Sequence, residues 1–523
     1  MTFPMPSNAP TELTPRHRRA VLAVMCLALM MVVAAVASLN VALPDLARGT
    51  HATQSELQWI VDAYTLVFAG LLLPAGALGD RFGRKGILLI GFVVFGGASL
   101  AAATVVNDPS TLIALRAVIG VGAALVMPTT LSIITNVFPE DERGRAVGIW
   151  AGIAGGGAMV GLVISGALLE WFSWPAVFTL NVLLAVLAFA GAVAIVPTSR
   201  STGQVRLDPA GALLSSLGLF ALVFGIIEAP LRGWLDALVL AGFAAGLVLL
   251  VTFVAYELHR REPMLDPRLF GQRGFGVGSL SLTLQFFALF GFMFVAQQYL
   301  QFVLGYSTFA AGAAALPMAV MMVGISPHAP KLAQRLGVRL VGGAGLCAMG
   351  IGFLAFATLD VGSSYWHFAA GAVITGIGMA LATSPATTAI VSSLPAHRQG
   401  IASAVNDLSR EVGSAFGIAV LGSALNSAYR SSIASATTHL PGPAADAARD
   451  SVAAAAQIAQ RAGPHGAALI DRAQSAFVDG LSTSLLVAAC VLFAAAVLVA
   501  ILAPRREQVA RRAASSPAVG ARS

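Results

Sequence analysis

The sequence has few charged residues for its length. Of its 523 residues only 11% are Asp, Glu, Lys or Arg, whereas a soluble globular domain carries about 25%. Hydrophobic residues make up 57% of the chain, and the mean hydropathy is +0.82. Because this composition suits contact with lipid rather than water, we infer an integral membrane protein embedded in the lipid bilayer.

Cysteine and nucleotide-binding motifs are also scarce or absent. The three cysteines are far apart and each lies in an apolar run, so they offer no metal-ligand spacing and no disulfide framework. No phosphate-binding loop of the G-x-x-x-x-G-K-[ST] type occurs, so ATP is not the expected energy source. No nucleophile or metal constellation is present either. We therefore expect no cofactor, no metal and no enzymatic activity.

Apolar runs long enough to span a bilayer recur along the chain. Fourteen are predicted, at 20–43, 57–78, 86–106, 111–136, 145–169, 174–196, 209–228, 237–257, 276–297, 308–328, 337–358, 366–390, 401–425 and 481–503. The first run is too long for the apolar core of a signal peptide, so we expect an uncleaved helix.

The basic residues predict the orientation. An even number of spans places both termini on one side, and that side holds 23 Lys and Arg residues against six on the other, with two inside spans. This asymmetry predicts that both termini are cytoplasmic. Because the basic residues gather in the loops and tails of one side of the membrane, membrane orientation accounts for the net charge of +7, and no nucleic-acid partner is expected.

An internal repeat predicts how the spans are grouped. Leu78–Lys85 (LGDRFGRK) aligns with Leu332–Arg339 (LAQRLGVR) at an offset of 254, and Arg143 aligns with Arg398 at 255. Two similar offsets indicate related halves with two helices inserted between them, a 6+2+6 plan with substrate near the midplane. The expected parts are an N-tail (1–19), a first half (20–196), inserted helices and loops (197–273), a second half (274–503) with an outer loop (427–480), and a C-tail (504–523). The outer loop is expected to contain one short amphipathic helix.

The stretch from Leu57 to Lys85 carries the most specific motif. Its apolar run contains Asp62, a costly intramembrane charge that calls for a functional or pairing explanation. The run ends at the charged turn GDRFGRK, whose glycines permit a tight backbone. This stretch, WIVDAY included, resembles the major facilitator superfamily and, within it, the 14-helix drug:proton antiporters of the QacA and EmrB kind.

The resemblance implies a conformational gate at this turn, formed by Gly79, Asp80, Arg81, Gly83 and Arg84. Asp80 is expected to cap the next helix or to pair with an arginine across the half, and to lock neighbouring helices in the outward-facing state. The alternative is a charged stop signal that only fixes topology. Gln334 replaces the acid in the second-half copy, so the lock of that half is expected to be weaker.

Two further motifs of the family fall in the first half. LRAVIGVG matches its RxxxGxG pattern through Arg116, and Asp62 lies at a comparable depth as a candidate partner. A structural ion pair and a proton-coupling pair are both open interpretations. Gly157, Gly161 and Gly166 resemble the antiporter signature GxxxGPxxGG, but Leu162 replaces its proline, so plain close packing remains open. Ala35 stands where these exporters usually have an aspartate.

The run 401–425 offers another location for the missing acid. Asp407 and Glu411 share a helix face and Arg410 is adjacent to both, about 15 Å into the membrane. Two acids and one arginine leave one excess negative charge, which can bind a cation or a proton. The alternative is a local salt bridge that only satisfies Arg410.

A drug-binding cavity would need aromatic and amide side chains. The candidates are Trp59, Tyr64, Gln285, Phe286, Gln297, Gln298, Tyr299 and Gln301, with ordinary helix packing as the alternative. The resemblance implies a monomeric, multi-pass transporter of the cell (inner) membrane that exports hydrophobic or cationic small molecules in exchange for protons. Alternatives are export of an endogenous metabolite, antibiotic or lipid, and a membrane sensor or scaffold with the same fold.

Overall fold

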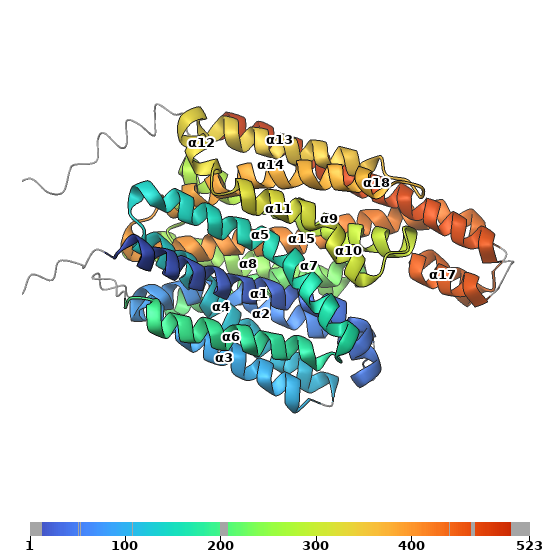
Figure 1. Ribbon diagram of the computed structural model, residues 1–523, viewed down its shortest axis with the longest axis horizontal. Coiled ribbons are helices and arrows are strands. Elements are labelled where there is room, and N and C mark those ends of the chain that lie inside the picture. The colour runs from blue at the N-terminus through green and yellow to red at the C-terminus, as the bar shows by residue number, and fades with distance from the viewer. Residues whose placement is uncertain are drawn as a thin grey trace, which may run out of the picture.

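The computed structural model describes residues 13–50, 52, 54–106, 108–198, 208–438, 440–461 and 466–503. Within these ranges the regular secondary structure is entirely helical, and the long helices lie side by side in one elongated bundle (Figure 1). The predicted C-tail and most of the predicted N-tail lie outside the described residues.

The first six long helices pack together. They are α1 (Pro15–Thr50), α2 (Gln54–Phe82), α3 (Arg84–Thr104), α4 (Pro109–Val137), α5 (Glu140–Trp171) and α6 (Pro175–Ile195). Their buried apolar side chains form one continuous cluster, to which later helices contribute little. Asp108 caps α4, since its Oδ2 accepts a hydrogen bond from the Thr111 amide at 2.8 Å.

The later helices form a second packed group. They are α9 (Arg273–Gln298), α10 (Thr308–Ala314), α11 (Leu316–Ile325), α12 (Ala329–Leu336), α13 (Val338–Ala357), α14 (Tyr365–Val391), α15 (Gln399–Ile433) and α18 (Ala467–Leu502). Short one-turn segments adjoin them: η1 (Pro267–Gly271), the π-helical η2 (Tyr299–Val303), η3 (Ala396–Arg398) and η4 (Ala434–Thr437). Most residues of the second buried apolar cluster belong to these elements.

The segment predicted as one span at 308–328 is interrupted in the structure. The chain breaks at Ala315 and again at Ser326–His328, and the axis bends by 59° between Ile325 and Ala329. Pro317 lies two residues after the first break and Pro327 lies within the second, and a proline cannot donate the backbone hydrogen bond that would continue a helix.

Twelve of the described helices are long and apolar enough to cross a membrane, and the bent α10–α12 segment makes thirteen if it is one span. The remaining predicted span, 145–169, falls within α5. This 32-residue helix packs against α1 and α11, but some of its side chains lie outside the described part of the structure, so its span stays a prediction. Within the described residues the fold is thus an all-helical membrane bundle with twelve or thirteen apolar spans.

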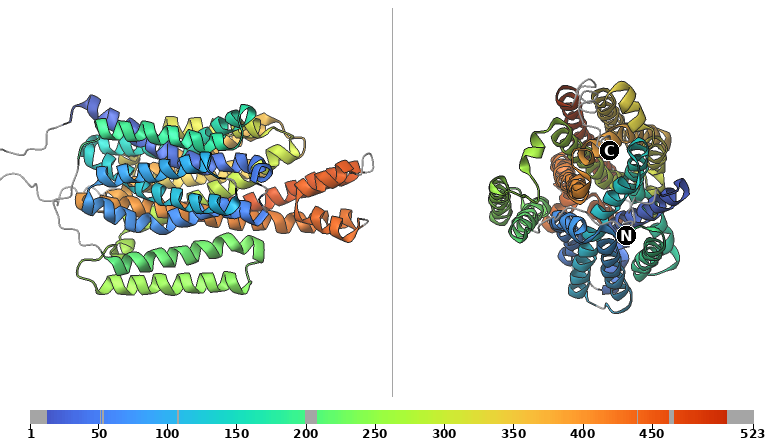
Figure 2. Two further views of the ribbon diagram at one scale, coloured as in Figure 1. Left: turned by 90° about the horizontal axis from the view of Figure 1, so that it is seen from below. Right: turned by 90° about the vertical axis from the view of Figure 1, so that its left-hand side faces the viewer.

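The helices α7 (Pro209–Arg232) and α8 (Ala237–His259) form a hairpin beside the bundle, as Figure 2 shows. Only α7 makes extensive contact with it, through α2 and α15. Many side chains of α8 are exposed, including the apolar Leu247, Val248 and Val251, as expected for a helix that faces lipid.

The predicted loop 427–480 is mostly helical. The helices α15 and α18 project beyond the rest of the bundle, and α16 (Gly442–Asp450) and α17 (Val452–Arg461) cover their ends (Figure 2). The single amphipathic helix expected here is wrong, because the chain leaves the helical conformation at Ser451. The Tyr429 hydroxyl secures this region by donating to the carbonyl oxygen of Ala448 at 2.9 Å.

The two groups of helices repeat the same turn geometry. Gly83 and Gly337, 254 positions apart, both have positive φ angles, 101° and 93°, that favour glycine. Pro139 and Pro395 precede matching helix starts with nearly identical backbone angles. That second offset is 256, so the structure pairs Arg398 with Glu142 rather than with Arg143. These four turns lie at the end of the bundle where α1 begins and α18 ends, which we call the termini end.

Candidate functional site

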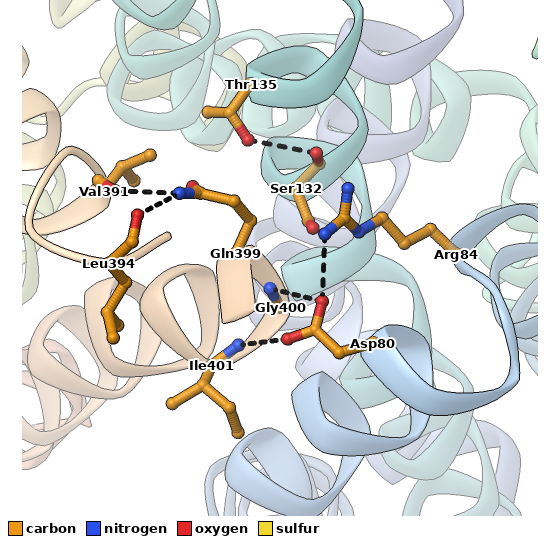
Figure 3. A network of polar contacts seen from close by, with 9 residues as sticks. All are labelled: Asp80, Arg84, Ser132, Thr135, Val391, Leu394, Gln399, Gly400 and Ile401. Atoms are coloured by element: carbon orange, nitrogen blue, oxygen red, sulfur yellow. Dashed lines mark hydrogen bonds and ion pairs between the residues drawn. The ribbon is translucent and has the colours of Figure 1, made fainter. Parts of the chain in front are cut away.

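Asp80 joins the two groups of helices at the termini end. The residue is 1% exposed, and its Oδ1 accepts hydrogen bonds from the Gly400 amide at 2.9 Å and from Arg84 Nη2 at 3.1 Å (Figure 3). The Ile401 amide donates to Oδ2 at 3.3 Å. These amides belong to the first turn of α15, where unpaired N–H groups and the helix dipole favour an anion.

The expectation that Asp80 caps the next helix is wrong. That helix, α3, begins after Gly83 without a side-chain cap, while Asp80 caps a helix 320 residues further along the chain. The arginine that pairs with Asp80 is Arg84, which lies four residues further along in the same charged segment, GDRFGRK. The carboxylate reaches α15 because α2 and α15 are in direct contact: a Cβ atom on Gly400 would clash with the carbonyl oxygen of Gly76. Arg81 is exposed at the end of α2.

The equivalent turn of the later group makes a different contact. Gln334 is exposed on α12, whereas Asp80 is buried. The neighbouring contact between α5 and α11–α12 consists of backbone and small groups, since a Cβ atom on Gly148 would lie 2.6 Å from the Ser326 oxygen. The termini end is therefore closed at two places, but a buried carboxylate holds only the α2–α15 contact.

A second polar cluster lies on α15, deeper in the bundle. Asp407 is 0% exposed and Arg410 is 3% exposed, and Arg410 Nη1 lies 3.7 Å from Asp407 Oδ1. Asn406 Nδ2 donates to the same oxygen at 3.1 Å. Asp407 Oδ2 and Arg410 Nε are buried without hydrogen-bond partners. Unpaired buried atoms are costly, so this cluster can gain free energy by binding a further polar or charged group.

Aromatic rings from both groups of helices enclose the arginine. The Arg410 guanidinium carbon lies 4.5 Å from the centre of the Phe286 ring on α9 and 5.4 Å from that of Trp150 on α5. Trp150 is 0% exposed and its Nε1 donates to Thr130 of α4 at 3.1 Å. Glu411 is partly exposed and interacts electrostatically with both Arg410 and Asp407. The structure thus brings these three predicted residues together.

Asp62 and Arg116 are not joined as the sequence suggested. Arg116 is 1% exposed, its Nε donates to the Ile60 carbonyl oxygen at 2.8 Å, and its guanidinium lies 4.5 Å from the centre of the Tyr64 ring. Among the described residues no ion pair links it to Asp62. Asp62 instead has Gln58 as its hydrogen-bonding side chain. The hydrogen bond from Arg116 therefore stabilises the backbone of α2 near Ile60.

The three candidate glycines of α5 have different surroundings. A Cβ atom on Gly161 would lie 2.8 Å from Ala34 Cα on α1, so this residue permits close helix packing. A Cβ atom on Gly157 would meet only ordinary contacts at 3.8 Å, and one on Gly166 would lie 3.4 Å from Phe309. At Gly161 the structure favours the packing interpretation.

The candidate cavity residues do not line one surface. Trp59 stacks on Phe224 of α7 with ring centres 6.1 Å apart, and Tyr64 is fully buried against α1. Gln285 is fully buried and accepts a hydrogen bond from Thr383 at 2.7 Å, inside the later group. The other candidates lie near η2, at the opposite end of the bundle. Gln297 donates a hydrogen bond to a backbone oxygen of α10, and Gln298 donates one to a backbone oxygen of its own helix. The Tyr299 hydroxyl donates to the backbone oxygen of Asp360, and Gln301 is half-buried. Of these candidates, Phe286 lies against Arg410 of the charged cluster, and Tyr64 interacts electrostatically with Glu411.

Sequence reasoning missed three residues beside these sites. Trp150 and Asn406 complete the surroundings of Arg410 and Asp407, and Glu228 of α7 is a buried acid close enough to Asp62 to interact with it electrostatically. Glu228 could have been found by the rule that drew attention to Asp62, since it is an acid inside an apolar run. Nothing in the local sequence marks Trp150, whose role depends on a contact between distant helices.

Comparison with known proteins identifies the family. The model of the Major Facilitator Superfamily matches residues 25–418, about three quarters of the chain. The chain belongs to this superfamily. Its members are membrane transporters of small molecules and not enzymes, so the expectation of no enzymatic activity is confirmed.

Individual superfamily members are similar over most of their length. The methyl viologen resistance protein SmvA of Salmonella typhimurium is 35% identical over 86% of this chain and 90% of its own. The multidrug efflux pump LfrA of Mycolicibacterium smegmatis is 33% identical over 94% and 97%. The crystallised proton:xylose symporter XylE has a TM-score of 0.60 and 14% identity over 96% of this chain and all of its own, which supports the fold alone.

Proposed function

We propose that this transporter exports hydrophobic or cationic small molecules in exchange for protons. In this proposal it is a monomeric 14-helix antiporter of the cell (inner) membrane, with both termini in the cytoplasm. The observation that carries the proposal is the cluster of Asp407, Arg410 and Glu411, which lies between aromatic rings of both groups of helices. Similarity to SmvA and LfrA supports the substrate class.

The chemistry of exchange follows from the charge balance. Asp407 and Arg410 neutralise each other, and Glu411 adds one negative charge. A proton or an organic cation can balance that charge, but both together would leave an excess positive charge in a medium of low dielectric constant. Competition for one charge therefore couples proton uptake to substrate release. Trp150 and Phe286 supply faces that also attract organic cations.

The contact of Asp80 with α15 supplies the gate. With cytoplasmic termini, the closed termini end corresponds to the outward-facing state. Opening toward the cytoplasm requires Asp80 to release the Gly400 and Ile401 amides. The binding energy of the gate must therefore stay small enough for the transport cycle to overcome.

Transport in inverted membrane vesicles tests this function. One inward proton driven by about 100 mV and one pH unit supplies about 3.7 kcal/mol, enough for a roughly 400-fold gradient of a neutral substrate. We expect a pH gradient to drive uptake of methyl viologen, a dication, and of lipophilic dyes. The matched control is Asp407→Asn with Glu411→Gln, at equal protein content. Gradient-independent uptake, or no uptake of any compound in a broad dye and antibiotic panel, would contradict the proposal.

A further inference from the structure

Two buried acids that the transport scheme does not use lie at the base of the inserted hairpin. Asp208 is the residue before α7 and is 4% exposed, and Glu257 lies near the end of α8 and is 1% exposed. Both are at the termini end, far along the chain from the charged cluster on α15. Burying two carboxyl groups together is costly unless something compensates their charge.

One oxygen of each acid has hydrogen-bond donors. Asp208 Oδ1 accepts from the Gly211 amide at 3.0 Å and from the Tyr256 hydroxyl at 3.1 Å. Glu257 Oε2 accepts from the Met264 amide at 2.8 Å. Asp208 Oδ2 and Glu257 Oε1 are buried without any hydrogen-bond partner.

The two unpaired oxygens face the same point. A Cβ atom on Gly211 would lie 2.6 Å from Glu257 Oε1 and 2.9 Å from Asp208 Oδ2. If both acids were ionised, the two carboxylates would repel each other, and neither of these oxygens would have a hydrogen-bond donor within normal distance. One proton on this pair removes one of the two charges and so reduces the repulsion between the carboxyl groups.

The charged neighbours favour a proton over a metal ion. The exposed Arg260 places its Nε 3.6 Å from Asp208 Oδ2, and Arg398 of η3 interacts electrostatically with Glu257. Two guanidinium groups oppose a further cation. In the described part of the chain no group of three or more His, Cys, Asp and Glu residues is arranged to hold a metal.

We propose that the pair Asp208 and Glu257 forms a proton-binding site that holds one proton and acts through Arg398 on the contact between Asp80 and α15. Arg398 lies two residues before Gly400, whose amide donates to Asp80. Loss of the proton changes the charge of the acid pair from −1 to −2. It therefore strengthens the attraction for Arg398 and holds the start of α15 in place. This role is independent of the exported substrate.

Infrared spectroscopy of the full-length protein in proteoliposomes tests the proton. We expect a carbonyl band of a protonated carboxylic acid that is lost both in Glu257→Gln and in Asp208→Asn, because either substitution leaves one acid whose single charge needs no proton. Both variants keep an acceptor for the Met264 or Gly211 amide. Gly211→Ala should alter the band, whereas Gly271→Ala should not, because a Cβ atom there meets nothing within 4 Å. Identical spectra for wild type and Glu257→Gln would overturn the proposal, as would loss of the band on adding sodium ions.

Amide hydrogen exchange tests the link to α15. At each pH, the exchange rate of an amide in Glu257→Gln is divided by its rate in wild type. This ratio removes the intrinsic effect of pH on amide exchange, so it can be compared between pH values. At high pH, where the wild-type pair has lost its proton, we expect Gly400 and Ile401 to exchange roughly two- to fivefold faster in the variant, as for a partly buried charge pair. The ratio should approach one at low pH. A ratio that does not change with pH would overturn the link.

Discussion

Replacing Asp80 with asparagine should open the contact between α2 and α15. The wild-type carboxylate accepts two amides from α15, Gly400 at 2.9 Å and Ile401 at 3.3 Å, and stays paired with Arg84. Asparagine keeps one oxygen but places an NH2 group where the other oxygen accepted a hydrogen bond. It also removes the charge that the start of α15 stabilises.

The expected cost follows from these two losses. A hydrogen bond to a charged group contributes about 1.5–3 kcal/mol, and a charge at a helix start about 0.3–1 kcal/mol. The closed termini end should therefore lose about 2–4 kcal/mol relative to the open one, which shifts the ratio of the two states roughly 30- to 700-fold. The bond to Arg84 is local to its own turn and does not enter this difference.

Two measurements check this prediction. Amide exchange at Gly400 and Ile401 should accelerate in Asp80→Asn, and pH-gradient-driven transport in inverted vesicles should fall at equal protein content. Thermal unfolding in detergent shows whether the variant is still folded. If Gly400 and Ile401 exchange as slowly as in wild type, the carboxylate does not hold the contact and the reasoning is refuted.

The other predictions concern the second copy of the turn and the buried acids. Gln334→Ala should change transport by less than about twofold, because this side chain is exposed; a loss as severe as that of Asp80→Ala would contradict the role assigned to the copy. Asp407→Asn with Glu411→Gln should abolish proton release on substrate addition, followed in detergent with a pH dye, while binding of neutral substrate remains. Asp62→Asn should weaken transport of cations more than of neutral compounds in parallel vesicle assays. If that variant alone abolishes proton release, coupling belongs to α2.

The apolar pattern predicted the helices well, because every backbone group inside a membrane must be hydrogen-bonded within its own segment. The predicted run 86–106 corresponds to α3, Arg84–Thr104. The broken segment after η2 was missed although it contains prolines. Pro74 and Pro128 lie within unbroken α2 and α4, so a proline alone does not tell whether neighbouring helices will satisfy the freed carbonyl groups.

The candidate sites were predictable only where the partners are close in sequence. The spacing of Asp407 and Arg410 on one helix was enough to predict their pairing. The partner of Asp80 could not be found in this way, because the Gly400 amide is a backbone group brought close by the packing of α2 on α15. Asp62 and Arg116 have similar depths, but depth does not specify the direction in which a side chain points.

The two contacts at the termini end differ in a way that limits what any single substitution can do. The α2–α15 contact combines glycine backbones with the buried Asp80 carboxylate, whereas the α5–α11 contact at Gly148 is made by backbone and small groups. Packing of this kind has no directional charge to lose, so it persists when the carboxylate is removed. Loss of Asp80 should therefore shift the balance between closed and open states without abolishing the closed one. In the proposed antiporter, the packed contact defines the closed geometry and Asp80 sets how long that geometry lasts.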